Sequence, residues 1–402
     1  MKKLVHLADL HLGARLRDRD RLAEQALLLD WLRGLLARER PDALVVAGDL
    51  FDVYYPSASA QQLWFDFLAR VRRENLAGRV VAIAGNHDSP SALGCAGRVL
   101  DLVGVSLLAG DASAADEALR VPCADGGFLA FAAIPFQREG ALRTQGRGDA
   151  VAGFRAHAAA ALAAARALAP DSPLVAVAHA ALSGAALSDD ESERARRAVG
   201  GVDAVPTDAF DGADYVALGH LHVPQKVGGR DAVRYAGSPL PMSFAEACSH
   251  KSALVVEFPG GPGDAPSVRE EPVPAFRPLR LLAGSREEAV AAARALAAEA
   301  PSGPAGAAWA ALSVTAGDGA FAETCRLVRA ALEGSGVELV AVSDDRAPDA
   351  GASPAAAAAL SVEDLRALTP ERLAADRLAE PDLRLSQEER DALLELAKEA
   401  MA

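Results

Sequence analysis

The chain has 402 residues, 51% of them apolar and 24% charged, and 55 acidic against 41 basic side chains give a net charge of −14. This composition excludes a disordered or fibrous protein, and the length allows two or three domains. The acidity argues against indiscriminate polyanion binding, but a local basic groove could still bind DNA.

The N-terminal segment MKKLVHLADLHLG carries two lysines before an apolar stretch, as a signal peptide does. Asp9 interrupts that stretch after about six residues, short of the ~7–15 that a signal core requires, so we predict a first strand instead. No run approaches the ~18 uninterrupted apolar residues of a membrane span. Since the four cysteines also form no C-x-x-C pair, the sequence predicts a cytoplasmic protein without membrane attachment.

Residues 1–275 are predicted to form the first domain. Its first 260 residues alternate short β-branched runs with longer amphipathic stretches, a pattern typical of strands and helices stacked in layers. Strands are predicted at KLVHLAD, ALVVAGD, VVAIAGN, PLVAVAH and YVALGH. Apolar spacings of three and four predict helices over 22–38 and 60–73. After Tyr215 the helical pattern gives way to strand-like runs, which indicate antiparallel pairing.

The remainder of the chain is predicted to form three further parts. Residues 276–346 have the order strand, helix, strand, helix, strand, with a capping box at Ser285 and Glu288, which predicts a small α/β domain. Residues 347–360 are rich in Ala, Pro and Gly and indicate a linker, although the alanines could continue a helix. Helix-start signals predict C-terminal helices over 361–402, with an apolar stripe that needs a surface to pack on.

Five of the predicted strands end in side chains that can bind a metal ion. These residues are Asp9 and His11, Asp49, Asn86 with His87 and Asp88, His179, and His220 with His222. Sites in layered α/β folds form beyond the carboxyl ends of strands, and an i, i+2 spacing directs both members of a pair to one side of an extended segment. A single histidine at a strand end is more often structural, but five together indicate a common site, because unpaired polar groups are costly to bury. The other histidines, His6, His157 and His250, are assigned to structure.

The chemistry of these side chains indicates the kind of metal site. Mixed imidazole, carboxylate and amide ligands suit Mn²⁺, Fe²⁺ or Zn²⁺. Even without His87 and Asp88 the set has seven ligands, which are too many for one tetrahedral ion. We therefore predict two divalent metal ions. A carboxylate can bridge both ions, and Asp49 is the natural bridge because it is the lone ligand of its strand end. Two such ions clamp the oxygens of a phosphodiester and activate water, so the pattern indicates hydrolytic phosphate chemistry.

The series D-x-H (9–11), G-D-x-x-D (48–52), G-N-H-D (85–88), His179 and G-H-x-H (219–222) resembles the calcineurin-like metallophosphoesterases. Within that superfamily, ADLHLG, VVAGDLFD, AGNHDS, ADYVALGHLH, VRYAGSPLPMSF and LSVEDL resemble the SbcD family of bacterial nuclease subunits. The resemblance implies an α/β layered fold: a β-sandwich flanked by helices, followed by a small α/β cap domain and C-terminal helices.

The same resemblance implies a role for each residue of the site. One metal ion would be held by Asp9, His11, Asp49 and His222, and the other by Asp49, Asn86, His179 and His220, with Mn²⁺ favoured for both. His87 would act at the leaving oxygen as proton donor or transition-state stabiliser, and Asp88 would orient His87. Three roles remain open for Asp52. Buried support of the neighbouring site residues or capping of a helix accounts for an aspartate at this position about as well as catalysis does.

The resemblance also implies partners. The protein would be a double-stranded DNA exonuclease and single-strand endonuclease that acts on DNA ends and hairpins in repair and recombination, in a heterotetramer with an SbcC-like ATPase. The cap at 276–346 would hold DNA, and the helices at 361–402 would dock on the ATPase, although a helix packing on its own domain has the same pattern. A homodimer and a nucleoid-associated location in the cytoplasm are expected.

Contacts to DNA phosphates need local cations. The best candidates follow the first motif directly and are Arg15, Arg17, Arg19 and Arg21. A solvated charge run explains them nearly as well, because aspartates are interleaved with the arginines. Arg194, Arg196 and Arg197 form a second candidate cluster.

Three other functions are alternatives to the nuclease. A stand-alone phosphodiesterase acting on a small nucleotide or lipid needs neither the accessory domain nor the amphipathic tail. A protein phosphatase of this superfamily would carry Arg-Gly after the second Asp of G-D-x-x-D, where this chain has Val53 and Tyr54. A DNA-end tether with a vestigial metal site predicts lost ligands, but every expected ligand is present.

Overall fold

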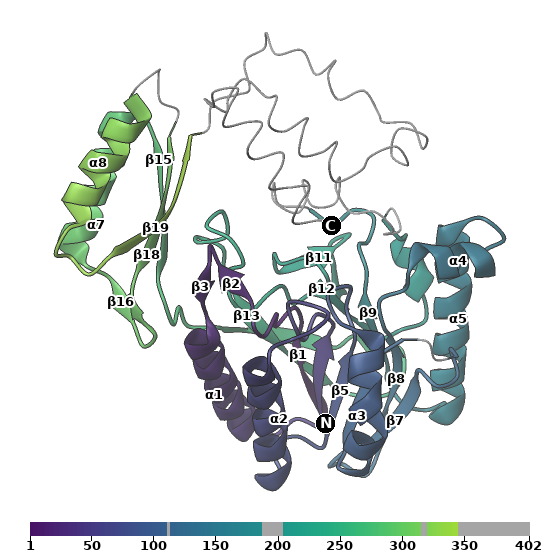
Figure 1. Cartoon of the computed structure of the whole chain (residues 1–402). Helices are drawn as coiled ribbons and strands as arrows, with labels where there is room; N and C mark the ends of the chain where they lie inside the picture. The colour runs from purple at the N-terminus through teal and green to yellow at the C-terminus, as the bar shows by residue number, and fades with distance from the viewer. Residues whose placement is uncertain (111–112, 187–203, 315–319, 345–402) are drawn as a thin grey trace, which may run out of the picture. The chain divides into compact units, whose positions relative to one another are not determined.

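The computed structural model describes residues 1–110, 113–186, 204–314 and 320–344 (Figure 1). The chain divides into the units Met1–Asp345 and Arg346–Ala402. The predicted linker, the C-terminal helices and the arginine cluster at 194–197 lie outside the described residues. None of the helices in the described ranges is long and apolar enough to cross a membrane.

The first sheet has the strand order β14-β13-β1-β4-β5-β6. Its strands are β1 (Lys2–Leu7), β4 (Ala43–Ala47), β5 (Arg79–Ile83), β6 (Val105–Leu108), β13 (Ser252–Phe258) and β14 (Ser267–Pro272). From β1 to β6 the neighbours are parallel, whereas β13 joins β1 antiparallel with Val255 opposite Val5. Runs such as ALVVA are apolar throughout because parallel strands are covered on both faces.

Helices α1 (Leu22–Glu39), α2 (Ala58–Arg73) and α3 (Pro90–Leu102) connect the parallel strands. The Ser57 hydroxyl accepts a hydrogen bond from the amide of Ala60, which caps α2. Ser89 caps α3 in the same way, and Pro90 stands at its first turn, where a missing N–H costs nothing. The helices predicted over 22–38 and 60–73 are confirmed within two residues at each end.

The second sheet has the order β11-β12-β10-β9-β8-β7. Its strands are β7 (Ala118–Pro122), β8 (Phe128–Ile134), β9 (Leu174–His179), β10 (Tyr215–Gly219), β11 (Gln225–Val227) and β12 (Arg230–Tyr235). The antiparallel pairing expected after Tyr215 is right for β11 with β12 but wrong for β10 with β12, which is parallel with Val216 opposite Val233. The tight hairpin between β11 and β12 reverses the chain, so β12 returns beside β10 in the same direction.

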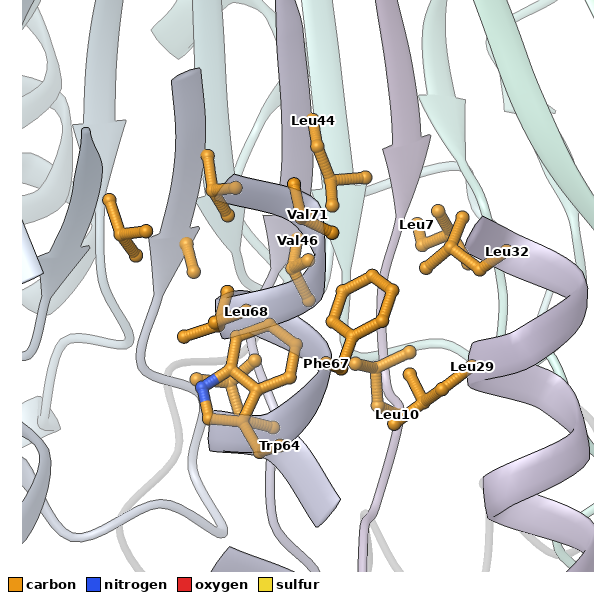
Figure 2. Close-up of a cluster of buried hydrophobic side chains, with 14 of the residues drawn as sticks. Leu7, Leu10, Leu29, Leu32, Leu44, Val46, Trp64, Phe67, Leu68 and Val71 are labelled. Atoms are coloured by element: carbon orange, nitrogen blue, oxygen red, sulfur yellow. The ribbon is translucent and has the colours of Figure 1, made fainter. Parts of the chain in front are cut away.

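Apolar side chains form successive layers through the two sheets. Between the sheets lies a cluster that includes Leu4, Val45, Val81, Phe131, Val177 and Tyr215. On the outer face of the first sheet, Figure 2 shows Leu7 and Val46 packed with Leu29 of α1 and with Trp64 and Phe67 of α2. The second sheet is covered by α5 (Ala150–Leu168), and α4 (Glu139–Gln145) packs beside that helix. The predicted β-sandwich flanked by helices is therefore confirmed.

The described residues from 277 to 314 and from 320 to 344 form the predicted small α/β fold. Its elements are β15 (Leu279–Gly284), α7 (Arg286–Glu299), β16 (Ser302–Gly303), β17 (Gly306–Ala307), β18 (Trp309–Val314), α8 (Ala320–Leu332) and β19 (Glu338–Asp344). The sheet β15-β18-β19 is parallel throughout, and the capping box of Ser285 and Glu288 is present at the start of α7. The predicted element order is confirmed, with the short β16–β17 hairpin as an addition.

His6 of β1 is a structural histidine, as predicted. It is completely buried, its Nδ1 lies 3.1 Å from the Tyr215 hydroxyl, and burial lowers its pKa to about 3. Unfolded chains take up this proton near pH 6.5, so His6 stabilises the fold fully above that pH and loses this contribution as the pH falls toward 3.

We expect acidification from pH 6.5 to pH 5 to cost about 2 kcal/mol of unfolding free energy through His6, since each pH unit between the two pKa values is worth about 1.4 kcal/mol. Urea unfolding of the wild type and of His6→Gln at both pH values measures this contribution. Between pH 6.5 and pH 5, the unfolding free energy of His6→Gln should fall by about 2 kcal/mol less than that of the wild type. An identical pH dependence in both proteins would show that His6 does not titrate in this way.

Candidate metal centre

Six of the predicted ligands lie on loops that follow β1, β4 and β5 of the first sheet and β10 of the second, and the seventh, His179, is the last residue of β9. Hydrogen bonds join these strand ends both within the first sheet and across the sandwich. The amide of Asp9 donates to the carbonyl of Gly48 at 3.0 Å, and the amide of His220 donates to the Asp9 carboxylate at 2.9 Å. The strand ends of both sheets therefore meet at one edge, as the sequence pattern predicts.

Four of the site residues have left-handed backbone conformations. The φ angles are 52° for Asp9, 43° for His11, 48° for Asp49 and 103° for His220. Such conformations cost roughly 1–3 kcal/mol each in residues with a side chain and persist only where the surroundings fix them. Here the parallel strands and the hydrogen bonds between the loops fix them, which is typical of a functional site.

Two glycines allow the close approach of these loops. A Cβ atom on Gly48, which has a φ of 90°, would lie 2.1 Å from Nδ1 of His179. A Cβ atom on Gly85 would lie 2.0 Å from a carboxylate oxygen of Asp49. Any larger residue at either position would displace a predicted ligand.

The first group of ligands consists of Asp9, His11 and His222, which are buried and whose ligand atoms lie within 4.8 Å of one another. Within the described part of the chain, neither ring nitrogen of His11 makes a hydrogen bond. The nearest carboxylate oxygens are those of Asp52, 3.3 Å from Nδ1, and Asp49, 3.5 Å from Nε2. Since buried polar atoms are nearly always hydrogen-bonded, an orphaned imidazole among carboxylates fits a cation ligand.

The second group gathers around Asn86. Its Oδ1 lies 2.9 Å from Nε2 of His179 and 3.0 Å from Nδ1 of His220. Nδ1 of His179 lies 2.9 Å from the carbonyl oxygen of Ala47, which can only accept, so Nδ1 carries the proton. Nε2 of His179 consequently faces Asn86 and also Asp49, whose Oδ2 is 3.5 Å away. A histidine that donates one N–H to a carbonyl while its other nitrogen faces an acidic cluster has the usual arrangement of a metal ligand.

The electrostatics also fit divalent cations. Burial raises the pKa of Asp9, and burial has the same effect on Asp49, where attraction to His179 outweighs it and holds the pKa below its usual range. Burial likewise lowers the pKa of His179, but the charge of Asp49 outweighs it and raises the pKa to about 9. Desolvation lowers the pKa of His220 to about 3, so this imidazole is neutral and able to bind a metal. The residues present therefore fit two divalent ions held by mixed nitrogen and oxygen ligands.

Comparisons with known proteins agree with this geometry. The family model described as calcineurin-like phosphoesterase matches residues 2–224, and the one described as type 5 capsule protein repressor C-terminal domain matches residues 275–381. The D subunit of the nuclease SbcCD from Escherichia coli K12 is 32% identical over 292 residues, which cover 70% of this chain and 71% of that protein. The corresponding proteins of Rhodobacter capsulatus and Bacillus subtilis are 36% and 33% identical, over 68% and 69% of this chain and 71% of each relative.

The chain belongs to the SbcD family of calcineurin-like phosphoesterases. The resemblance indicated by its motifs is thereby confirmed, and so is the fold that the resemblance implied.

In this SbcD-family chain, His87 lies beside the ligand cluster and is held at two points. Its amide donates to Oδ1 of Asp49 at 2.9 Å, and its Nδ1 donates to the carbonyl oxygen of Asp52 at 2.7 Å. Its ring centroid is 4.9 Å from that of His11. Asp52 thus supports His87 through its backbone and approaches His11 through its carboxylate, which favours the supporting role among those that the sequence left open.

Asp88 does not orient His87 by a side-chain contact, which corrects the expectation from the sequence. Its hydrogen bonds among the described residues come from the backbone amides of Leu50, Phe51 and Gly85, at 2.9–3.0 Å. Burial and the neighbouring charge of Asp49 raise the pKa of Asp88 to about 6. Asp88 therefore joins the loop after β4 to the loop after β5, and it reaches the site through the backbone.

The β2–β3 hairpin, formed by Arg15–Leu16 and Arg19–Asp20, carries most of the predicted DNA contacts. Its exposed arginines are Arg15, Arg17 and Arg19. Arg21 is only 2% exposed, and its guanidinium donates to the Glu24 carboxylate at 2.7 Å and to the Pro241 carbonyl at 2.6 Å. The prediction for Arg21 is wrong, because a buried and neutralised guanidinium is not available to a phosphate.

The sequence pattern did not indicate two buried charged residues next to the site. Oε1 of Glu246 lies 3.5 Å from Nδ1 of His222, and Nζ of Lys251 lies 2.6 Å from Oε2 of Glu246. Neither residue follows a strand or forms a spacing pattern with the ligands. The contact is visible only in three dimensions.

Proposed function

We propose that this chain is the nuclease subunit of a complex with an SbcC-like ATPase and hydrolyses phosphodiester bonds of DNA at double-strand ends and hairpins. The observation that carries the proposal is the gathering of seven predicted ligands at the meeting edge of two sheets. The relatives are named as D subunits of the nuclease SbcCD, which supports both the nuclease activity and the ATPase partner. The stand-alone phosphodiesterase is not favoured by these relatives.

Two divalent ions would be bound, with Mn²⁺ as the favoured metal. One would be held by Asp9, His11, Asp49 and His222, and the other by Asp49, Asn86, His179 and His220. Bound there, such ions activate water and stabilise the charge that develops on the phosphate during in-line displacement. The contact between Asp49 and one histidine of each set supports its role as the bridge.

His87 is proposed as the residue that acts at the leaving oxygen. Because Nδ1–H donates to the carbonyl of Asp52, Nε2 is the nitrogen that can hold or give up a proton toward substrate. The amide bond to Asp49 keeps the ring next to the ligand that both ions would share. Asp88 contributes through its hydrogen bonds to backbone amides, which fix the loop that carries His87 against the loop after β4.

We also propose a role for each of the four parts of the chain. Residues 1–275 form the nuclease domain, 276–346 the DNA-holding cap, 347–360 the linker and 361–402 the ATPase-docking helices. A separate family model matches residues 275–381, which supports a domain boundary at the start of the cap. Phosphate contacts are proposed for the exposed arginines of the hairpin, Arg15, Arg17 and Arg19.

A homodimer is proposed to form through the end of α3. Val99, Leu102 and Val103 are 68%, 86% and 50% exposed, and an exposed apolar patch is typical of a protein contact. We expect Leu102→Asp to convert the wild-type dimer to a monomer, as measured by light scattering after size exclusion, with Mn²⁺ binding unchanged. A variant that remains dimeric at the same concentration would exclude this face as the dimer contact.

The activity is tested with end-labelled linear duplex DNA and, in parallel, bis(p-nitrophenyl) phosphate, each with Mn²⁺ or Mg²⁺. Both substrates are incubated with the chain alone and with the cognate ATPase and ATP. We expect degradation of the duplex that depends on the metal ion and is stimulated by the ATPase with ATP. Cleavage of the small diester with intact DNA under all conditions would replace the nuclease by a free-standing phosphodiesterase.

A further inference from the structure

A buried ion pair lies beside one of the metal-ligand candidates. Glu246 and Lys251 are 5% and 6% exposed, and their charged groups are 2.6 Å apart. The desolvation cost of a buried pair can exceed its Coulombic gain, and well-packed apolar residues often replace such a pair without loss of stability. Fold stability alone therefore gives little reason for these two charges at this place.

The pair contacts His222 at two points. Nζ of Lys251 donates to the carbonyl oxygen of His222 and to the hydroxyl of Ser238, both at 3.0 Å. Oε1 of Glu246 faces Nδ1 of the His222 ring at 3.5 Å, while Oε2 accepts from Lys251 and from the amide of Met242. The ammonium thus holds the backbone of His222, and the carboxylate faces its ring.

We propose that Glu246 and Lys251 are positioning residues that orient His222 toward the divalent cation it would bind. With the Glu246 carboxylate facing Nδ1 at 3.5 Å, the tautomer that carries the proton on Nδ1 is favoured, and Nε2 would then be the ligand atom in the group with Asp9 and His11. Lys251 holds the other oxygen of Glu246, so this carboxylate stays directed at the ring. The proposal rests on the two-metal function proposed above.

A second buried carboxylate–imidazole pair provides a matched control. Glu117 and His157 are 0% and 8% exposed, and Oε2 of Glu117 lies 2.7 Å from Nε2 of His157. His157 lies on α5 and belongs to none of the metal-binding groups found among the described residues. Glu117→Gln therefore removes the same charge from the same kind of pair without touching a ligand candidate.

The test is Mn²⁺ binding by the metal-free, full-length chain, measured by calorimetry and by the electron paramagnetic resonance signal of free Mn²⁺. Removing the partner of a ligating histidine typically weakens metal affinity 10- to 100-fold. We expect Glu246→Gln and Lys251→Met each to raise the Kd of one of two Mn²⁺ sites by about that factor. Glu117→Gln should leave both dissociation constants at the wild-type values.

The double variant Glu246→Leu/Lys251→Met guards against misfolding, because it leaves no unpaired charge in the core. It should fold and still show the weakened site. Wild-type affinity at both sites in this folded variant would overturn the positioning role. A wild type that binds two Mn²⁺ ions but leaves duplex DNA intact would instead overturn the proposed nuclease function and leave the positioning role standing.

Discussion

Replacing Asp49 with asparagine is expected to lower kcat for phosphodiester hydrolysis by about 10³-fold or more, equivalent to about 4 kcal/mol of transition-state stabilisation. Its Oδ2 lies 3.5 Å from Nε2 of both His11 and His179, one histidine from each proposed ion site, and its Oδ1 accepts from the amide of His87. Asparagine keeps the size of the side chain but loses the negative charge that two cations would share. The number of bound Mn²⁺ ions should also fall from two to one or none.

Asp42→Asn is the matched control for this variant. Asp42 is also a buried carboxylate and lies just before β4 begins, but it accepts hydrogen bonds from the amides of Lys3 and Ala124. Its loss should lower stability and leave the Mn²⁺ stoichiometry unchanged. If Asp49→Asn retains two Mn²⁺ ions and more than a tenth of the wild-type kcat, Asp49 is not the bridge.

His87→Ala is expected to lower kcat on DNA by about 10²–10⁴-fold while the chain still binds two Mn²⁺ ions. His87 is in neither of the proposed ligand sets, and its ring is held by the carbonyl of Asp52 rather than by a second charge. Single-turnover cleavage of end-labelled duplex, with Mn²⁺ stoichiometry measured on the same preparation, separates lost chemistry from lost metal.

The leaving group provides an internal control for His87. The DNA leaving group is an alkoxide that needs a proton, whereas p-nitrophenolate leaves without one. The reduction in kcat caused by His87→Ala should therefore be smaller on bis(p-nitrophenyl) phosphate than on DNA. His250→Ala, which removes an exposed histidine, should leave kcat unchanged on both substrates. An equal loss on both substrates would contradict proton donation to the leaving oxygen.

The sandwich and its ligand cluster could be predicted because their signals are local in the sequence. Each buried strand ends abruptly in a polar residue, as at Asp9 after β1 and His179 at the end of β9, and parallel strands bring such ends to one edge. The small α/β fold beyond Phe276 was equally predictable from periodicity and the capping box. Chain order alone, however, did not fix the direction of β12 relative to β10, because a short hairpin intervenes.

The roles that the sequence pattern missed or misassigned depend on contacts between distant segments. The buried guanidinium of Arg21 donates to the carbonyl of Pro241, which is 220 residues away in the sequence. Asp88 accepts hydrogen bonds from amides of the loop after β4. Glu246 reaches His222 only because the loop before β13 folds back on the site. Such contacts leave no spacing pattern, so no periodicity or motif could have indicated them.

We expect one cluster to hold two divalent ions that share Asp49. This arrangement can be tested by anomalous diffraction at the manganese absorption edge, from crystals of the metal-free protein soaked in Mn²⁺. Two anomalous peaks should lie on either side of the Asp49 carboxylate, one near His11 and His222 and the other near His179 and His220. A single peak, or a second peak remote from Asp49, would contradict it.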